Sequence, residues 1–144
     1  MTAFLCDDWA RALCAALNAS PAYAEAAATW EGDLCFVARA GDAPDGSRLD
    51  ADRTAYLDLD RGTCRGARAV ADASAAGAAF AIEAAYADWR KILSGGLDPI
   101  MAVMLGKLRV AGDKSVVLRH AKAAKAMVAC AAAVETEWPA APAG

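Results

Sequence analysis

Residues 86–112 constrain the fold most, because almost every helix and strand boundary in this stretch has a residue type that specifies it. Trp89, Ile92 and Leu93 fall at i, i+3 and i+4, which predicts a helix with one apolar face. Residues 94–96, Ser-Gly-Gly, end this helix, since glycine adopts the left-handed conformation of a helix terminus without strain. The stretch therefore divides into short elements.

A second short helix is predicted at once, because Asp98 is a favourable N-cap and Pro99 suits the first helical position. We expect its apolar residues at 3/4 spacing to face the protein interior: Met101, Met104, Leu105 and Leu108. Gly106 then closes a turn. A brief strand follows over residues 108–110, and a final helix begins at Asp113.

This order of elements resembles the sterol carrier protein type 2 (SCP-2) domain. Residues 97–99 match the Leu-Asp-Pro of its Gly-Leu-Asp-Pro turn, and residues 106–112 match its Gly-Lys-Leu-Arg-Val-x-Gly strand. Residues 54–62, and residues 80–83 leading into Trp89, are similar to the same family. The resemblance extends along the whole chain, and it is to the stand-alone bacterial members.

The resemblance implies an α+β fold in which a small, largely antiparallel sheet carries helices on one face and encloses a hydrophobic cavity. The residue patterns predict the same layers. We expect one domain over residues 1–144, with helices in 1–29, the sheet and short helices in 30–112, and a C-terminal helix over 113–133.

Periodicity predicts the remaining elements. One helix is expected from about residue 3 to 18, and a second from a Ser20 cap to about residue 28. Strands are expected at residues 34–38, 56–60, 67–71 and 78–84. Leu57 and Leu59 alternate with polar residues, so one sheet face is expected to be wet. The final helix should bury the stripe Val117, Ala121, Ala124, Val128 and Ala131.

The composition excludes several classes of protein. No apolar run is long enough to span a bilayer, and the N-terminus lacks the basic and apolar regions of a secretory signal. The C-terminus lacks a Ser-Lys-Leu address, so we expect a cytoplasmic protein. Five cysteines without a CxxC pair and a single histidine predict reduced thiols, no metal site and no cofactor.

The large apolar residues of the predicted helices have two interpretations, a plain core or the wall of a ligand cavity. The resemblance implies the cavity, a tunnel that takes sterols, phospholipids or fatty acyl groups, and methionine suits a flexible ligand. The candidate ligand-binding residues are Phe80, Trp89, Ile92, Leu93, Ile100, Met101, Met104, Leu105, Leu118, Met127 and Val128.

The charges are segregated along a chain whose net charge is -3. Residues 106–130 contain six basic residues against Asp113 alone. The candidate membrane-docking residues are Lys114, Arg119, Lys122 and Lys125. They form either an ordinary solvated face or a surface for anionic lipid. Nucleic acid is an unsuitable partner, because the pI is about 5.1 and no aromatics interleave the basic residues.

No catalytic constellation is present in the sequence. His120 lacks an adjacent nucleophile and acid and is expected to be a solvated helix residue, while Cys64, near several arginines, is the least implausible nucleophile. The sequence and the resemblance therefore predict non-enzymatic binding and transfer of apolar lipids: sterol-like, fatty acyl, phospholipid or isoprenoid. The alternative is an accessory or dimerisation module that acts in trans with an enzyme, for example in quinone or lipid metabolism, and such a module would be compatible with a homodimer.

Overall fold

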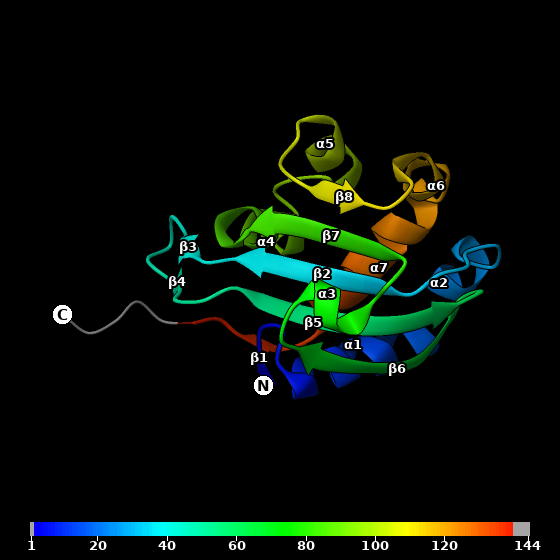
Figure 1. The fold of residues 1–144 in the computed structure, drawn as a ribbon, viewed down its shortest axis with the longest axis horizontal. Helices are drawn as coiled ribbons and strands as arrows, with labels where there is room; N and C mark the ends of the chain where they lie inside the picture. Colours follow the sequence, from blue (N-terminus) through cyan, green and yellow to red (C-terminus); the bar gives the residue numbers. More distant parts are fainter. Residues whose placement is uncertain (1, 140–144) are drawn as a thin grey trace.

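The computed structural model describes residues 2–139 and contains a five-stranded sheet with most of its helices packed on one face (Figure 1). The strand order is β6–β5–β2–β7–β8; the central pair β2–β7 is parallel and the other pairs are antiparallel. The strands of this sheet are β2 (Leu34–Arg39), β5 (Arg53–Asp60), β6 (Thr63–Val70), β7 (Phe80–Ala85) and β8 (Arg109–Ala111). The predicted α+β class is confirmed.

The helices occupy both sides of the sheet unequally. They are α1 (Asp7–Asn18), α2 (Pro21–Ala26), α3 (Ala73–Ala76), α4 (Tyr86–Leu93), α5 (Pro99–Met104), α6 (Lys114–Arg119) and α7 (Ala121–Ala133). Helices α1, α4 and α7 lie behind the sheet in Figure 1, on what we call the covered face. The one-turn helix α3 lies on the opposite face, over β2, β5 and β6. Prediction of helices on one face thus holds for all but this short segment.

The first helix starts later than predicted. It begins at Asp7, because Leu5 has a φ of +59° and Cys6 is an extended N-cap whose Sγ accepts from the Trp9 amide. The residues before it form β1 (Thr2–Ala3), which pairs in parallel with β9 (Thr136–Glu137). A pairing partner so distant in sequence leaves no local pattern. The second helix is capped by Ser20 as predicted.

The central hairpin follows the predicted alternation. Leu57 and Leu59 are buried while the polar residues between them are half-buried. The strand predicted at 67–71 starts earlier, at Thr63, because Arg61 and Gly62 make a two-residue turn with positive φ and the ladder resumes at once. A Cβ on Gly62 would lie 2.6 Å from the Ala24 carbonyl oxygen, so glycine is required there. A shorter hairpin joins β3 (Gly41–Asp42) and β4 (Arg48–Leu49).

The single helix predicted from residue 113 is divided in two. His120, with φ -106° and ψ 37°, breaks it into α6 and α7. This break changes the phase of the packing face. In α7 the buried residues are Ala123, Met127 and Ala131, whereas the predicted Ala121, Ala124 and Val128 are half-buried. The predicted stripe is therefore correct at Val117 and Ala131 and displaced by about one residue between them.

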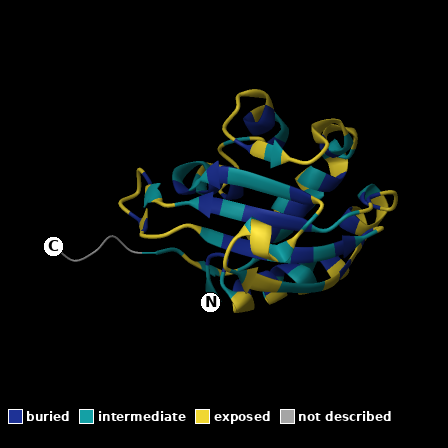
Figure 2. Cartoon of the chain, in the orientation of Figure 1, coloured by how far each residue is buried: buried dark blue, intermediate teal, exposed yellow. Residues whose placement is uncertain are grey.

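The core lies between the covered face and α1, α4 and α7, and exposed residues gather on the outer helix surfaces and loops (Figure 2). Aromatic side chains dominate its α1 end, where Phe4 packs edge-on against Trp9 with ring centroids 5.3 Å apart. Within residues 2–139, no helix is both long enough and apolar enough to cross a membrane.

Candidate functional site

Small apolar cavities lie in a row between the covered face of the sheet and α7. The first has a volume of about 40 Å³ and lies between Tyr23, Trp30 and the start of α7. The second, also about 40 Å³, lies beneath α5. The third, about 10 Å³, lies between the N-terminal aromatics and the end of α4. Carbon atoms form almost all of the exposed lining of each cavity.

The cavities share their dividing walls. Ile82, Val117, Ala124 and Met127 line both the first and the second cavity. Phe36, Trp89 and Val128 line both the second and the third. Neighbouring cavities therefore share the side chains that separate them, and we call the row of cavities between sheet and helix the path. Ligand pockets for small molecules usually enclose about 300 to 1,000 Å³, so a lipid tail would have to displace these dividing side chains.

Local sequence explains why space remains along this path. Helix α7 presents Ala123 and Ala124 to the cavities, and alanine cannot reach the opposite sheet as a larger side chain would. The sheet side is formed by the inward set of strand residues, among them Leu34, Phe36 and Ile82. Met127, the flexible residue of the wall, is buried between the first two cavities.

Two polar side chains stand at the first cavity. Burial, and then the nearby Cys64 and Cys130, raise the pKa of Tyr23 to about 12, so its hydroxyl stays neutral. His120 Nδ1 lies 2.8 Å from the Val116 carbonyl oxygen and therefore donates to it. Its Nε2, 3.1 Å from Thr29 Oγ1, then accepts from that hydroxyl. The sequence-based expectation that His120 is a solvated helix residue is wrong, because it is half-buried at the helix break.

The chain matches the model of the SCP-2 sterol transfer family over residues 11–125. It belongs to this family. A crystal structure of a sterol carrier protein 2 is 36% identical, with a TM-score of 0.74, and the match covers 91% of this chain and 98% of the other. A conserved protein from Thermus thermophilus, described as a candidate sterol carrier protein, is 37% identical with a TM-score of 0.75, covering 93% and 91%.

More distant structures share the fold. Sterol carrier protein 2 from Yarrowia lipolytica, in its apo form, is 17% identical with a TM-score of 0.54, and the match covers 85% of this chain and 88% of the other. A comparison with curated protein sequences found no match. Membership of the SCP-2 family supports lipid binding or transfer in general, and the row of apolar cavities is compatible with it.

The structure brings together about half of the residues that the sequence nominated for the cavity. The second cavity is lined by Trp89, Ile92, Ile100, Met127 and Val128, and the third by Leu93 as well. Phe80 is buried, but it packs on Trp30 at a centroid distance of 4.9 Å and lines none of these cavities.

The predicted orientation of α5 is wrong. Met101, Met104 and Leu105 are 50%, 72% and 59% exposed, and Leu118 on α6 is 37% exposed. The inner face of α5 consists instead of Pro99, Ala102 and Val103, which are buried. Both sides of this helix are apolar, so spacing alone did not select one. The smaller side packs closely against the protein, and the larger side faces outward.

Sequence reasoning missed the strand and loop residues of the path. Leu34, Phe36, Leu59 and Ile82 line the cavities and were interpreted only as strand core. Strand alternation, continued across neighbouring strands, was the signal that could have found them. Tyr23 and Trp30 come from α2 and the loop after it, and no local pattern placed them opposite α7.

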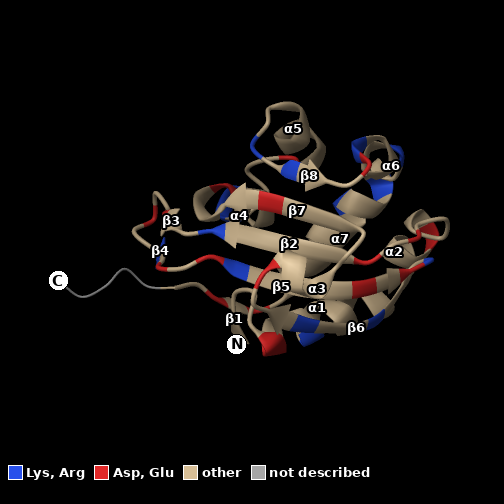
Figure 3. Cartoon of the chain, in the orientation of Figure 1, with Lys and Arg blue, Asp and Glu red and all other residues tan. Residues whose placement is uncertain are grey.

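The basic residues lie at the edge of the molecule formed by β8, α6 and the start of α7 (Figure 3). Lys114, Arg119 and Lys122 are exposed there. Lys125 Nζ lies 3.7 Å from Asp98 Oδ2, a solvent-exposed pair between α7 and the N-cap of α5. Exposed pairs of this kind contribute little stability.

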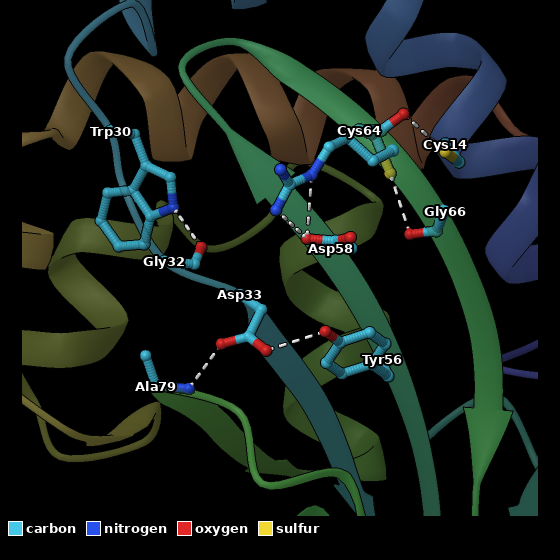
Figure 4. Close-up of polar contacts among 10 residues, drawn as sticks. Cys14, Trp30, Gly32, Asp33, Tyr56, Asp58, Cys64, Gly66 and Ala79 are labelled. Carbon is cyan, nitrogen blue, oxygen red and sulfur yellow. Dashed lines mark hydrogen bonds and ion pairs between the residues drawn. The ribbon is translucent and has the colours of Figure 1, made fainter.

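The uncovered face of the sheet is polar and its groups bind one another (Figure 4). The Tyr56 hydroxyl donates to Asp33 at 2.8 Å, and Asp33 also accepts from the Ala79 amide at 2.7 Å. Burial opposes ionisation of Asp33, but these two hydrogen bonds together lower its pKa. Burial, followed by the hydrogen bond to Asp33, raises the pKa of Tyr56 to about 12.

The two buried thiols, Cys35 and Cys64, are unsuited to nucleophilic chemistry. Burial, and then the neighbouring Cys14 thiol, raise the pKa of Cys64 well above its ordinary value, and burial also raises that of Cys35. The sequence-based suggestion of Cys64 as the least implausible nucleophile therefore finds no support. Among the described residues no group of three or more His, Cys, Asp or Glu side chains could hold a metal ion.

Proposed function

We propose that this protein binds the apolar part of a lipid along the path between the covered face and α7, and exchanges that lipid with membranes. The observation that carries the proposal is the row of carbon-lined cavities, each of which shares lining side chains with its neighbour. Sterol-like molecules, fatty acyl chains, phospholipids and isoprenoids all present a tail for such a path. Membership of the SCP-2 family favours the same function.

The driving force is burial of ligand surface, at about 25 cal/mol per Å² of apolar area. Part of this gain offsets the cost of moving Ile82 and Met127, which line both of the first two cavities. A lining with so few polar groups selects weakly, since one methylene changes binding by only about 1 to 3 kcal/mol. We therefore expect the protein to accept several lipid classes.

We propose a binding role without catalysis, carried out in a reducing compartment such as the cytoplasm. All five cysteines are free, which suits such a compartment. Two polar side chains stand at the cavities, Tyr23 and His120. The hydrogen bonds of His120 go to Thr29 and to the Val116 carbonyl, so they do not build a hydrogen-bonded triad of nucleophile, base and acid. The basic edge at Lys114, Arg119, Lys122 and Lys125 would provide transient contact with anionic membranes.

A second candidate function is an accessory module that acts in trans with an enzyme. The exposed Met101, Met104 and Leu105 favour it, because a row of large apolar side chains on a surface is typical of an interaction site. A module of this kind would need no lipid, so the two candidates separate on ligand uptake.

The test uses one substitution at two positions of α7. Ala124 lines the first and second cavities, whereas Ala129 is exposed on the same helix. Ala124→Leu should weaken binding of a fluorescent long-chain fatty acid by roughly tenfold or more, equivalent to about 1.4 kcal/mol, because it fills the path. Ala129→Leu should bind as the native protein does, and Ala124→Val should fall between them.

Equal affinity in the native protein and Ala124→Leu would exclude this path as the binding site. Native mass spectra of protein purified without detergent provide an independent measurement, since a bound lipid adds its mass. A native protein that carries no lipid and takes up none from a lipid mixture would favour the accessory module.

A further inference from the structure

The exposed large hydrophobic side chains of residues 2–139 are concentrated in one place. They are Met101, Met104 and Leu105 at α5 and Leu118 on α6. Single exposed apolar residues are normal on a protein surface, but here three occur within five residues on the outer side of one short helix. We call Met101, Met104 and Leu105 the apolar tip.

Basic side chains lie next to the apolar tip. Lys107 and Arg109 follow it directly and are exposed, and α6 and the start of α7 continue the positive edge (Figure 3). Two acidic residues also lie on this edge, and both have partners within it. Asp98 accepts from the Ile100 and Met101 amides and pairs with Lys125, and Asp113 accepts from the Ser115 amide and hydroxyl.

An apolar tip beside a basic edge is complementary to one occupant in particular, an anionic lipid bilayer. The methionine and leucine side chains would enter the boundary between headgroups and acyl chains, while lysine and arginine contact the anionic headgroups. A soluble protein partner would need acidic groups around an apolar pocket to satisfy both features. The bilayer satisfies both with its ordinary composition.

The opposite side of α5 belongs to the cavity path. Pro99, Ile100 and Val103 line the second cavity. The helix is six residues long, and glycines with positive φ, Gly95 at +85° and Gly106 at +76°, stand before and after it. One short element thus separates the second cavity from the surface at which the apolar tip is exposed.

We propose that α5 is the membrane-entering element of this protein: its apolar tip inserts into an anionic bilayer and brings the wall of the second cavity to the lipid. The inference rests on the proposed function for what the cavity carries, but the membrane contact itself stands on the exposed side chains and the neighbouring charge. Lipid would pass between α5 and the sheet.

The experiment compares the triple variant Met101→Ser, Met104→Ser, Leu105→Ser with a matched triple variant on the far side of the sheet, Ala69→Ser, Ala71→Ser, Ala75→Ser, whose residues are also exposed. Each protein is floated with vesicles of phosphatidylcholine containing phosphatidylglycerol, and with phosphatidylcholine alone. Transfer of a fluorescent fatty acid between anionic vesicles, and its binding in vesicle-free buffer, are measured on the same samples.

The apolar-tip variant should bind anionic vesicles roughly tenfold or more weakly than the native protein, and its transfer rate should fall in parallel. Its fatty-acid affinity in vesicle-free buffer should change by less than about twofold, because the altered side chains line no described cavity. The control variant should match the native protein throughout. Met101→Leu with Met104→Leu should retain vesicle binding, since it keeps the tip apolar.

Three outcomes would overturn the inference. The first is equal flotation of the native protein and the serine variant, and the second is a native protein that does not float with anionic vesicles. The third is a native dimer that the serine substitutions convert to a monomer without loss of flotation, which would assign the tip to subunit contact. If vesicle binding depends on the tip but no fatty acid binds in vesicle-free buffer, the membrane contact stands and the lipid-carrier proposal fails.

Discussion

Helices α4 and α5 follow one another along the chain, but α4 turns its larger apolar residues to the protein interior and α5 its smaller ones. Helix α4 buries its largest apolar residues, Tyr86 and Trp89, whereas α5 buries Ala102 and Val103 and exposes its methionines. The difference arises from the rest of each helix. Three charged residues on α4 leave it one apolar face, but α5 has no charged residue between Pro99 and Met104 and could pack on either side.

The comparison teaches that periodicity determines the orientation of a helix only where polar residues exclude the alternatives. On α4 the pattern had one solution and the prediction was right. On α5 it had two, and contact with α7 selected the smaller side. The larger apolar side of α5 is left in water, so its contact with another apolar surface would still provide the free energy of burial. This is the physical basis of the membrane contact proposed above.

A substitution on α4 should cause the greatest loss of stability. Trp89 is 4% exposed, donates from Nε1 to the Val37 carbonyl oxygen at 2.9 Å and packs against Phe36. Trp89→Ala should lower the free energy of unfolding by about 3 to 5 kcal/mol, because it leaves a cavity and removes the hydrogen bond to the Val37 carbonyl. Urea unfolding measures the change. A loss below about 1 kcal/mol would mean that α4 is not the anchored member of the pair.

An intermediate effect is expected within α5. Val103 is 3% exposed and Met104 72% exposed, so alanine at each position compares the two sides of one helix. Val103→Ala should lower the free energy of unfolding by about 2 kcal/mol, and Met104→Ala by less than about 0.5 kcal/mol. Chemical denaturation of both variants measures the two losses in the free energy of unfolding. Equal losses would contradict the orientation described for α5.

The smallest change in stability is expected from the N-cap of α5. Hydrogen bonds from the Met101 and Ile100 amides, opposed by slight desolvation and assisted by Lys125, lower the pKa of Asp98 below its ordinary value of 3.8. A carboxyl whose pKa is lower in the folded state stabilises the protein above its unfolded pKa, and this stabilisation is lost as pH falls through the folded pKa.

Melting temperatures of the native protein and Asp98→Ala should therefore differ at neutral pH and converge as the pH is lowered below 3.8. Asp98→Asn serves as the control, because asparagine also caps helices but carries no charge to pair with Lys125. A native advantage that persists unchanged in acid would show that ionisation of Asp98 does not support α5.

Local signals predicted the parts of the fold that are specified by neighbouring residues. The Ser20 and Asp98 caps and the alternation around Leu57 depend on residues within a few positions of one another, and all are present. The pairing of β1 with β9 depends on residues at opposite ends of the chain. The break at His120 depends on contacts with Thr29 and Trp30, far away in sequence.

The candidate site was predicted about as far as helical spacing and family resemblance allow. The resemblance implied the cavity, and helical spacing on α4 indicated Trp89 and Ile92. To place Phe36 and Ile82 at the cavities, one must know which strands are neighbours. Neither β2 nor β7 contains a local signal for their parallel pairing. The apolar tip could not be predicted as a surface, because its composition is that of a core.

That parallel pairing also sets an order for folding. The β5–β6 hairpin closes through a two-residue turn, and hairpins of this kind form in about 1 to 10 μs. The β2–β7 pair must wait for the long segment between them to return, a slower closure with a greater entropic cost. Because β8, at the edge of the five-stranded sheet, pairs with β7 alone, the segment that carries α5 is joined to the sheet through a single neighbouring strand. In hydrogen exchange, this edge should open before the central strands do.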